Sequence, residues 1–190
     1  GTQGIKNALR AGIDSIEHGI YLDAECIELM RKGSVPLVPT MSALFNIEKN
    51  GVEAGIPEFA VDKTLRVKPF FLESLRMARE AGVVVAMGTD AGTPFNCHGG
   101  NAEELVFLTQ SGFTAGEALV AATGTAAGVL GLEQEIGSIE AGKLADLLLV
   151  RGNPLQDVDL LCHPENICLV LQEGRVIKDT QQLVVSTNNR

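Results

Sequence analysis

The sequence predicts an α/β fold in which short, buried, parallel strands alternate with amphipathic helices. Three short apolar segments, residues 13–19, 35–38 and 83–87, are each followed or ended by a polar residue, and stretches with helical periodicity lie between them. The chain has 190 residues, of which 45% are hydrophobic, so it is large enough to bury a core. Because parallel strands end at the same edge of a sheet, we expect their polar ends to lie together, where α/β proteins build active sites.

The first half of the chain alternates regularly between helix and strand. Residues 1–12 predict a helix that ends at Gly12, and residues 13–19 predict a strand that ends in Glu17-His18-Gly19. Asp23 can cap a second helix over residues 24–32, with Gly33 at its end. Prolines at positions 36 and 39 limit the hydrogen bonding of the next strand, which has Thr40 at its tip.

The next segment is less regular, and two interpretations stay open. Residues 41–61 contain Gly51, Gly55 and Pro57, and could form a lid or substrate loop, or a surface excursion that contains a short helix. Residues 62–81 predict a helix with Pro69 as a candidate break point, and the strand of residues 83–87 follows it. This strand leads directly into Gly88-Thr89-Asp90, and we expect it to be buried on both faces.

The pattern changes in the last third of the chain. Helices are expected over residues 102–111, 115–122 and 125–130, the second of them capped by Thr114. A turn-rich segment then leads to a strand at residues 145–150 and a hairpin around Glu173-Gly174-Arg175. We therefore predict an α/β part over residues 1–133, a small β unit over residues 134–180, and a tail over residues 181–190, of which residues 188–190 are expected to be frayed.

Charge and cysteine content exclude some classes of function. The net charge of −9 argues against partners such as nucleic acids or anionic membranes, and no apolar run is long enough to span a bilayer. No leader sequence is visible, although the chain begins with Gly1 rather than Met. None of the four cysteines forms a Cys-x-x-Cys pair, which favours free thiols and a cytoplasmic location.

Two strand tips carry side chains that could bind a metal. His18 ends the first strand and Asp90 follows the third, and imidazole with carboxylate is a ligand set that suits zinc. Asp90 could also take a proton from an activated water. Each residue has a plainer interpretation, since His18 could be a structural histidine and Asp90 could cap the following turn. Two ligands are not yet a site, because a catalytic zinc needs about three protein ligands.

The order of three motifs resembles the amidohydrolase superfamily. These motifs are Ser15-Ile16-Glu17-His18-Gly19, Gly88-Thr89-Asp90-Ala91-Gly92-Thr93-Pro94 and the segment from Gly137 to Leu147. The chain is similar to the C-terminal half of its imidazolonepropionase-like and Xaa-Pro dipeptidase-like branch, over residues 1–178. This resemblance implies the C-terminal part of a (β/α)8 TIM barrel, about strands 6–8, followed by a small β unit that belongs to a β-sandwich domain.

The resemblance also implies roles for individual residues. His18 would be the metal-ligating histidine at the end of strand 6, Asp90 the strand 8 aspartate that is both ligand and general base, and His98 a candidate substrate contact. The expected cofactor is a divalent metal, most simply zinc, with one or two ions in the complete enzyme. The implied reaction is hydrolysis of amide or other C–N bonds, in a small-molecule or dipeptide substrate.

The sequence departs from the family in the ligands that it lacks. The His-x-His pair of strand 1, the bridging lysine of strand 4 and the histidine that ends strand 5 are absent from these 190 residues. A full barrel takes about 250 residues. We therefore expect a fragment of a longer enzyme, or a subunit that needs a complementing N-terminal half or forms a homo-oligomer, with an uncovered sheet edge.

Two hypotheses without catalysis stay open beside the hydrolase. The chain could be a catalytically inactive remnant or an assembly module. It could also be a small α/β binding protein with a structural zinc held by Cys97-His98 and Cys162-His163, although the spacing is not that of a standard zinc module.

Overall fold

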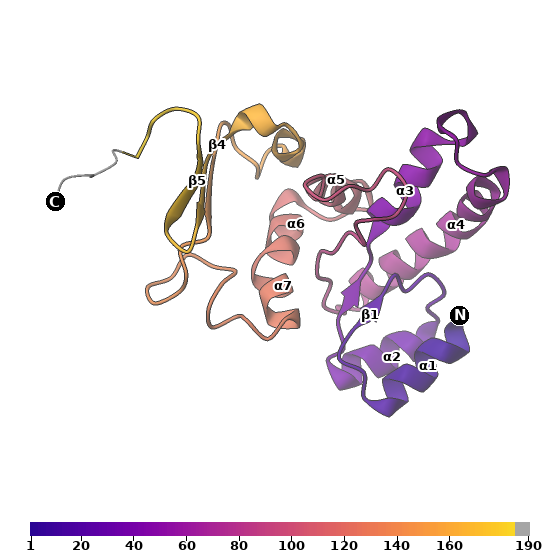
Figure 1. The fold of residues 1–190 in the computed structure, drawn as a ribbon. Helices are drawn as coiled ribbons and strands as arrows, with labels where there is room; N and C mark the ends of the chain where they lie inside the picture. Colours follow the sequence, from indigo (N-terminus) through magenta and orange to yellow (C-terminus); the bar gives the residue numbers. More distant parts are fainter. Residues whose placement is uncertain (185–190) are drawn as a thin grey trace.

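The computed structural model describes residues 1–184 and shows an elongated α/β molecule. In Figure 1 helices α1–α4 lie at one end, the C-terminal sheet lies at the other, and α5–α7 lie between them. The α-helices and the first two 3-10 turns have the following bounds: α1 Thr2–Ala11, α2 Ala24–Gly33, α3 Met41–Asn50, η1 Val52–Ala54, α4 Glu58–Glu80, α5 Glu103–Gln110, α6 Ala115–Ala122, α7 Gly124–Val129, and η2 Val158–Cys162. The others are η3 Pro164–Asn166 and the strands β1 Ile16–Glu17, β2 Leu37–Val38, β3 Leu147–Val150, β4 Ile167–Gln172 and β5 Arg175–Asp179.

The predicted parallel strands pair in the expected order, but they are very short. β1 pairs with β2 in parallel, with Ile16 opposite Leu37. The third strand is reduced to a parallel bridge between Leu37 and Val85, in which the Leu37 amide donates to the Val84 carbonyl at 2.9 Å. Pro36 carries no amide hydrogen, so β2 begins only at Leu37 rather than at residue 35. His18, Thr40 and Asp90 therefore lie at the ends of three strands that are side by side, with β2 in the middle.

The strand of residues 83–87 is less buried than predicted. Val83, Val85 and Ala86 are buried, but Val84 is 50% exposed. Side chains of a strand alternate between its two faces, and within residues 1–184 little covers the face to which Val84 belongs. One face of this strand is thus packed on the core, and the other remains accessible.

Most helix ends follow from local sequence. Gly12 ends α1 in the left-handed conformation with φ 84°, and the Asp23 side chain caps α2 by accepting from the Cys26 amide. The predicted end at Gly33 is wrong by one residue. Gly33 is still helical, and Ser34 adopts the left-handed conformation while its amide bonds to the Arg31 carbonyl.

The segment of residues 41–61 is more regular than its sequence indicates. It forms helix α3 and the short turn η1, and α3 buries Met41, Phe45 and Asn46 against the core. The periodicity of this buried face is obscured by polar residues, because Ser42 and Asn46 are buried with their polar groups hydrogen-bonded.

Helix α4 begins earlier than predicted and is continuous through Pro69. It runs from Glu58 to Glu80, and its buried residues include Thr64, Phe71 and Leu75 on both sides of the proline. Pro69 itself is exposed. The missing hydrogen bond therefore faces solvent, while packing of the flanking turns holds the helix together.

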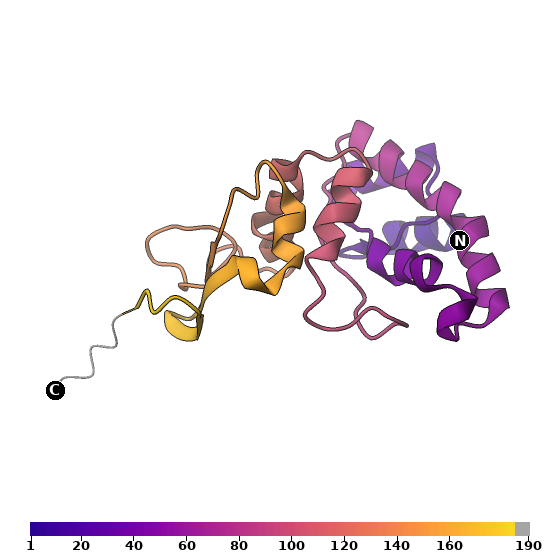
Figure 2. The same cartoon turned by 90° about the horizontal axis from the view of Figure 1, so that it is seen from above.

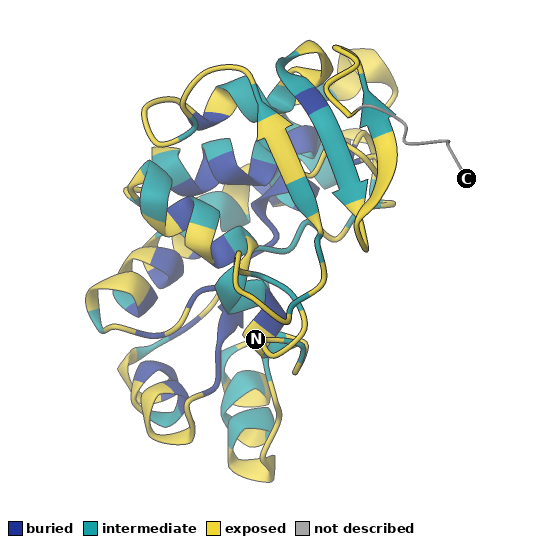
Figure 3. Ribbon diagram, turned by 90° about the vertical axis from the view of Figure 1, so that its left-hand side faces the viewer, coloured by how far each residue is buried: buried dark blue, intermediate teal, exposed yellow. Residues whose placement is uncertain are grey.

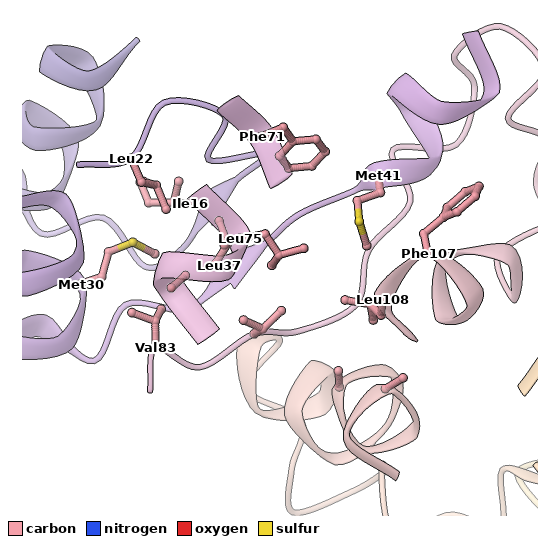
Figure 4. Close-up of a cluster of buried hydrophobic side chains, with 14 of the residues drawn as sticks. Ile16, Leu22, Met30, Leu37, Met41, Phe71, Leu75, Val83, Phe107 and Leu108 are labelled. Carbon is pink, nitrogen blue, oxygen red and sulfur yellow. The ribbon is translucent and has the colours of Figure 1, made fainter. Parts of the chain in front are cut away.

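The main core lies where α2, α3, α4 and α5 meet the short parallel strands. Figure 4 shows its side chains converging from these elements, with Met30, Leu37 and Met41 among the fully buried ones. Phe45 stacks edge-on against Phe107 of α5, with ring centroids 4.9 Å apart. Figure 2 shows α5 between the α3–α4 region and the C-terminal part of the chain, which places it at the centre of the molecule.

The C-terminal β unit is a three-stranded antiparallel sheet in the order β3-β4-β5. The predicted hairpin is confirmed, and its turn residues Glu173 and Gly174 both have positive φ, as a type I′ turn requires. Figure 3 shows that most residues of this sheet are exposed or half-buried, and Leu148 and Ile177 are 59% and 61% exposed. A large part of the predicted tail, residues 185–190, lies outside the described residues.

In the part of the chain that the structure covers, no helix is both long enough and apolar enough to cross a membrane. All four cysteines carry free thiols, as expected from their spacing. The cytoplasmic location inferred from them stays a prediction.

Candidate active site

His18 lies at the end of β1, where the chain leaves the sheet. Its amide donates to the Val38 carbonyl at 2.9 Å, which continues the β1–β2 pairing by one residue. The loop that follows is held by Ser74 of α4, whose hydroxyl donates to the Ile20 carbonyl at 2.8 Å and accepts from the Leu22 amide at 2.9 Å. His18 is thus fixed by the sheet on one side and by a helix on the other, and its imidazole is half-buried.

The imidazole of His18 is oriented by the tip of the neighbouring strand. Its Nδ1 lies 2.6 Å from Thr40 Oγ1, and the same hydroxyl donates to the Pro39 carbonyl at 2.6 Å. A hydroxyl has a single hydrogen, so Thr40 must accept from Nδ1–H. For the neutral ring this network favours the Nδ1–H tautomer, in which Nε2 carries the free lone pair that can bind a metal.

Asp90 follows the third strand and begins a loop held by a buried side chain. The Asn96 amide nitrogen donates to the carbonyls of Thr89 at 2.6 Å and Asp90 at 3.0 Å, and Asn96 is 5% exposed. The loop is closed further by hydrogen bonds between residues 92 and 96. The Asp90 carboxylate is exposed, while its backbone is fixed.

All three strand tips have strained backbones. His18, Thr40 and Asp90 have φ values of 64°, 54° and 53°, in the left-handed region. This conformation is uncommon for residues other than glycine, and for a β-branched residue such as Thr40 it is a real outlier. Such strain persists only where the surroundings enforce it, and it gathers at functional sites.

His18 and Asp90 line the same cleft, of about 520 Å³. The rest of its wall is mainly apolar and comes from the loop after β1, from helices α3 and α4, and from the loop after Asp90. The lining side chains other than His18 and Asp90 are Ile20, Tyr21, Ala43, Leu44, Ile47, Phe59, Ala60, Lys63, Thr64, Val67 and Thr93. An imidazole and a carboxylate at the end of an apolar cleft can bind a small organic molecule and act on a polar bond within it.

The structure brings together two of the predicted site residues but not the third. His98 is exposed in the loop after Asp90 and is not among the residues that line the cleft. Its role as a substrate contact stays a prediction.

The structural zinc site that the third hypothesis requires, built from cysteine and histidine, is not formed among the described residues. Among residues 1–184, no three His, Cys, Asp or Glu side chains are placed to hold one metal ion. Cys97 is exposed, and Cys162 lines a different cavity of about 760 Å³ between α5 and the C-terminal unit. Burial raises the pKa of Cys162 to about 11, so it is a thiol rather than a thiolate ligand near neutral pH. The donors His18 and Asp90 have the chemistry of a metal site, but alone they do not complete one.

Three residues that support the site were not among the predicted site residues. Asn96 and Ser74 act through hydrogen bonds to backbone groups, and nothing in the local sequence marks them. Glu104 of α5 is fully buried and accepts hydrogen bonds from the start of α3. A signal for Glu104 does exist, because it lies on the same helix face as the buried residues Phe107 and Leu108, three and four positions further on.

Three known proteins show what this chain is similar to. Ochratoxinase of Aspergillus niger is 32% identical over 181 residues, which are 94% of this chain and 36% of that protein. Imidazolonepropionase of Rubrobacter xylanophilus is 34% identical over 172 residues, 84% of this chain and 41% of that protein. The crystal structure of a Xaa-Pro dipeptidase with bound methionine in the active site superposes with a TM-score of 0.83 at 41% identity, over 94% of this chain and 43% of that chain.

The chain spans less than half the length of each of these relatives. Residues 1–177 match the sequence profile of the Amidohydrolase family, which is almost the whole chain. The predicted branch is confirmed as well, since an imidazolonepropionase and a Xaa-Pro dipeptidase are both among the similar proteins. This chain therefore belongs to the amidohydrolase family.

Proposed function

We propose that the protein containing this chain is a metal-dependent hydrolase of amide or other C–N bonds, with His18 and Asp90 in its active site. The observation that carries the proposal is the placement of both residues in one cleft, at the ends of two parallel strands that flank β2. In α/β proteins this edge is where catalytic residues gather. The family membership of the chain supports the class of reaction.

The residues of this chain have separate roles in the proposal. A divalent metal, most simply zinc, would supply Lewis acidity and make a bound water more acidic. His18 would offer Nε2 as a ligand, because its Nδ1–H is engaged by Thr40. Asp90 would be a second ligand, and its carboxylate, exposed toward the cleft, would accept the proton of the attacking water. The remaining ligands would come from outside these residues.

The cleft and the relatives together favour a small substrate. Its walls are mostly apolar, and Lys63 is a cationic side chain among its lining residues. Similar proteins are named as a Xaa-Pro dipeptidase, an imidazolonepropionase and an ochratoxinase. We propose a dipeptide or a cyclic amide as the substrate class, and a peptidase or cyclic amidase as the enzyme class.

We also propose the part of the enzyme to which these residues correspond. Residues 1–133 would contribute about strands 6–8 of a (β/α)8 barrel, and residues 134–180 would belong to a β-sandwich domain. Apolar side chains left accessible on the α/β part support the presence of a further covering segment, since Val84, Val120 and Leu130 are 50%, 58% and 68% exposed. An N-terminal half would cover them, and a second copy of the chain is the alternative.

The test is an Asp90→Asn variant of the intact protein, assayed against a panel of Xaa-Pro dipeptides and cyclic amides with and without added Zn²⁺. We expect loss of most turnover with an unchanged circular dichroism spectrum, because the carboxylate is exposed and contributes little to packing. Asp62→Asn is the matched control, since Asp62 is an exposed aspartate of α4 that does not line the cleft. Near-normal turnover in Asp90→Asn would reject the assignment.

A second candidate function is an assembly module without catalysis. It is favoured by the incomplete ligand set, since the described residues hold no group of three potential metal donors. This alternative predicts that the natural protein elutes as a sharp oligomer in gel filtration, retains no metal and hydrolyses none of the panel. Retained zinc together with hydrolysis would exclude it.

A further inference from the structure

Glu104 is a buried charged residue that the proposed reaction does not use directly. It lies near the start of α5 and is 0% exposed. A carboxylate in the interior is strongly unfavourable unless its oxygens are hydrogen-bonded. Its partners therefore indicate why the position holds a glutamate.

The partners of Glu104 are the first groups of another helix. Oε1 accepts from the Met41 amide at 2.7 Å, and Oε2 accepts from the Ser42 amide at 2.8 Å and the Ser42 hydroxyl at 2.6 Å. The amides at a helix start have no partner within the helix, and the helix dipole favours a negative charge there. Glu104 therefore caps α3 from a distance of more than 60 residues in sequence.

This capping arrangement is unusual because Thr40 occupies the N-cap position of α3. A threonine at this position commonly accepts a hydrogen bond from an amide of the first turn. Here Thr40 makes no such side-chain cap bond. Its hydroxyl instead accepts from His18 Nδ1 at 2.6 Å, and its backbone is held in the left-handed region.

We infer that Glu104 is a positioning residue for His18: by capping α3 in place of Thr40, it frees the Thr40 hydroxyl to hold the histidine in its Nδ1–H tautomer. The connection is continuous, since Glu104 fixes the amides of Met41 and Ser42, and these residues directly follow Thr40. The catalytic consequence rests on the proposed function, in which His18 Nε2 is a ligand. The effect on the histidine itself does not depend on that function.

Glu104→Gln is the informative substitution. A glutamine amide can offer its oxygen to only one of the two sites, so either the Met41 or the Ser42 amide faces an NH₂ group and loses its acceptor. Glu103→Gln is the matched control, because Glu103 is the adjacent glutamate and bonds to Lys49 and Asn46 rather than to the first amides of α3. Both substitutions remove one negative charge from the same turn.

The direct measurement is the tautomer of His18, by NMR of the intact metal-free protein labelled with ¹⁵N-histidine and assigned with a His18→Asn variant. We expect the Nδ1–H form in the wild-type protein and in Glu103→Gln, and a mixture of both tautomers in Glu104→Gln. An unchanged tautomer in a folded Glu104→Gln protein with a lowered melting temperature would show that Glu104 only stabilises the fold. That result would overturn the inference.

Kinetics supply the second readout. Loss of an outer-shell partner commonly lowers metal affinity or activity by about 10- to 100-fold, and we expect a loss of this size in kcat/KM for Glu104→Gln. Thr40→Val should cause a similar loss, and Glu104→Gln should add less than about twofold in the Thr40→Val background, since coupled residues are not additive. Independent, multiplicative effects would contradict action through Thr40.

The inference can still be tested if Glu104→Gln does not fold or if the wild-type protein is inactive. If Glu104→Gln does not fold, Ser42→Ala removes only the hydroxyl donor, and a smaller shift of the tautomer in the same direction is expected; no shift would count against the inference. If the wild-type protein hydrolyses none of the substrates, the proposed function fails, while the tautomer measurement still decides the role of Glu104.

Discussion

Gly19, which follows His18, is the glycine of the site that should tolerate a side chain least. Its φ is +62°, and a Cβ added there would lie 2.5 Å from Leu37 Cδ1 and 3.5 Å from Leu22 Cδ1. Leu37 is 0% exposed and belongs to the main core, so its methyl group cannot move without displacing close-packed neighbours. Gly19→Ala therefore combines backbone strain with a steric clash.

The contributions of backbone strain and of the steric clash can be measured separately by comparison with a second glycine, Gly12. The left-handed conformation costs about 1–2 kcal/mol for a residue with a Cβ, and overpacking a core costs about 1–3 kcal/mol. Gly12 has φ +84° with nothing within 4 Å of an added Cβ, so Gly12→Ala carries the strain alone. We expect Gly19→Ala to lower the free energy of unfolding by about 1–3 kcal/mol more than Gly12→Ala does, which is the overpacking contribution.

Urea denaturation of the intact protein, followed by circular dichroism, measures both variants under the same conditions. Gly19→Ala should also reduce hydrolysis, because the clash displaces the residue next to His18, whereas Gly12→Ala should retain it. Equal destabilisation of the two variants, within about 0.5 kcal/mol, would show that Leu37 moves aside freely and would refute the packing argument.

Three further predictions concern the loop, a helix start and pH. Asn96→Ala removes three hydrogen bonds that hold the loop of Asp90. Steady-state kinetics should then show a reduced kcat, and limited proteolysis should show faster cleavage within residues 90–100. An unchanged kcat would mean that the loop keeps its conformation without the Asn96 side chain. Thr114→Ala breaks the capping box with Glu117 at the start of α6 and should lower the free energy of unfolding by about 1 kcal/mol, with unchanged kinetics. An unchanged free energy of unfolding in urea denaturation would show that the capping box does not stabilise the protein. Burial raises the pKa of Glu104 to about 6 from its ordinary 4.5, so the folded state binds the proton more tightly. Stability should therefore fall as pH rises, by about 2 kcal/mol in total, with the steepest loss between pH 4.5 and 6. The difference in unfolding free energy between wild type and Glu104→Gln measures this pH dependence, and a difference that is constant with pH would contradict it.

Local patterns in the sequence predicted the helices and the polar strand tips. The helix starts at Asp23 and Thr114 were predicted correctly because a cap is formed by residues only three positions apart. The hairpin at Glu173-Gly174 was predicted for the same reason, since its turn needs two residues with positive φ. The motifs around His18 and Asp90 indicated the family, which the family profile confirms.

Patterns in the sequence failed where distant residues decide the outcome. Pro69 predicted a break, but α4 is continuous because packing at Thr64 and Phe71 holds the turns on both sides. The segment after Thr40 seemed irregular because its buried face includes Ser42 and Asn46, whose partners Glu104 and Glu103 are about 60 residues away. Hydrogen bonds across such separations leave no periodic signal.

The sequence by itself determined which side chains could do chemistry and the strands whose ends carry them. Only the tertiary structure decided how they are held: Thr40 orients His18, Asn96 holds the Asp90 loop, and Glu104 caps the helix that follows Thr40. The physical reason is that residue type and spacing fix the chemical groups and the local backbone. The choice among hydrogen-bond partners, by contrast, depends on which segments folding brings together and removes from water.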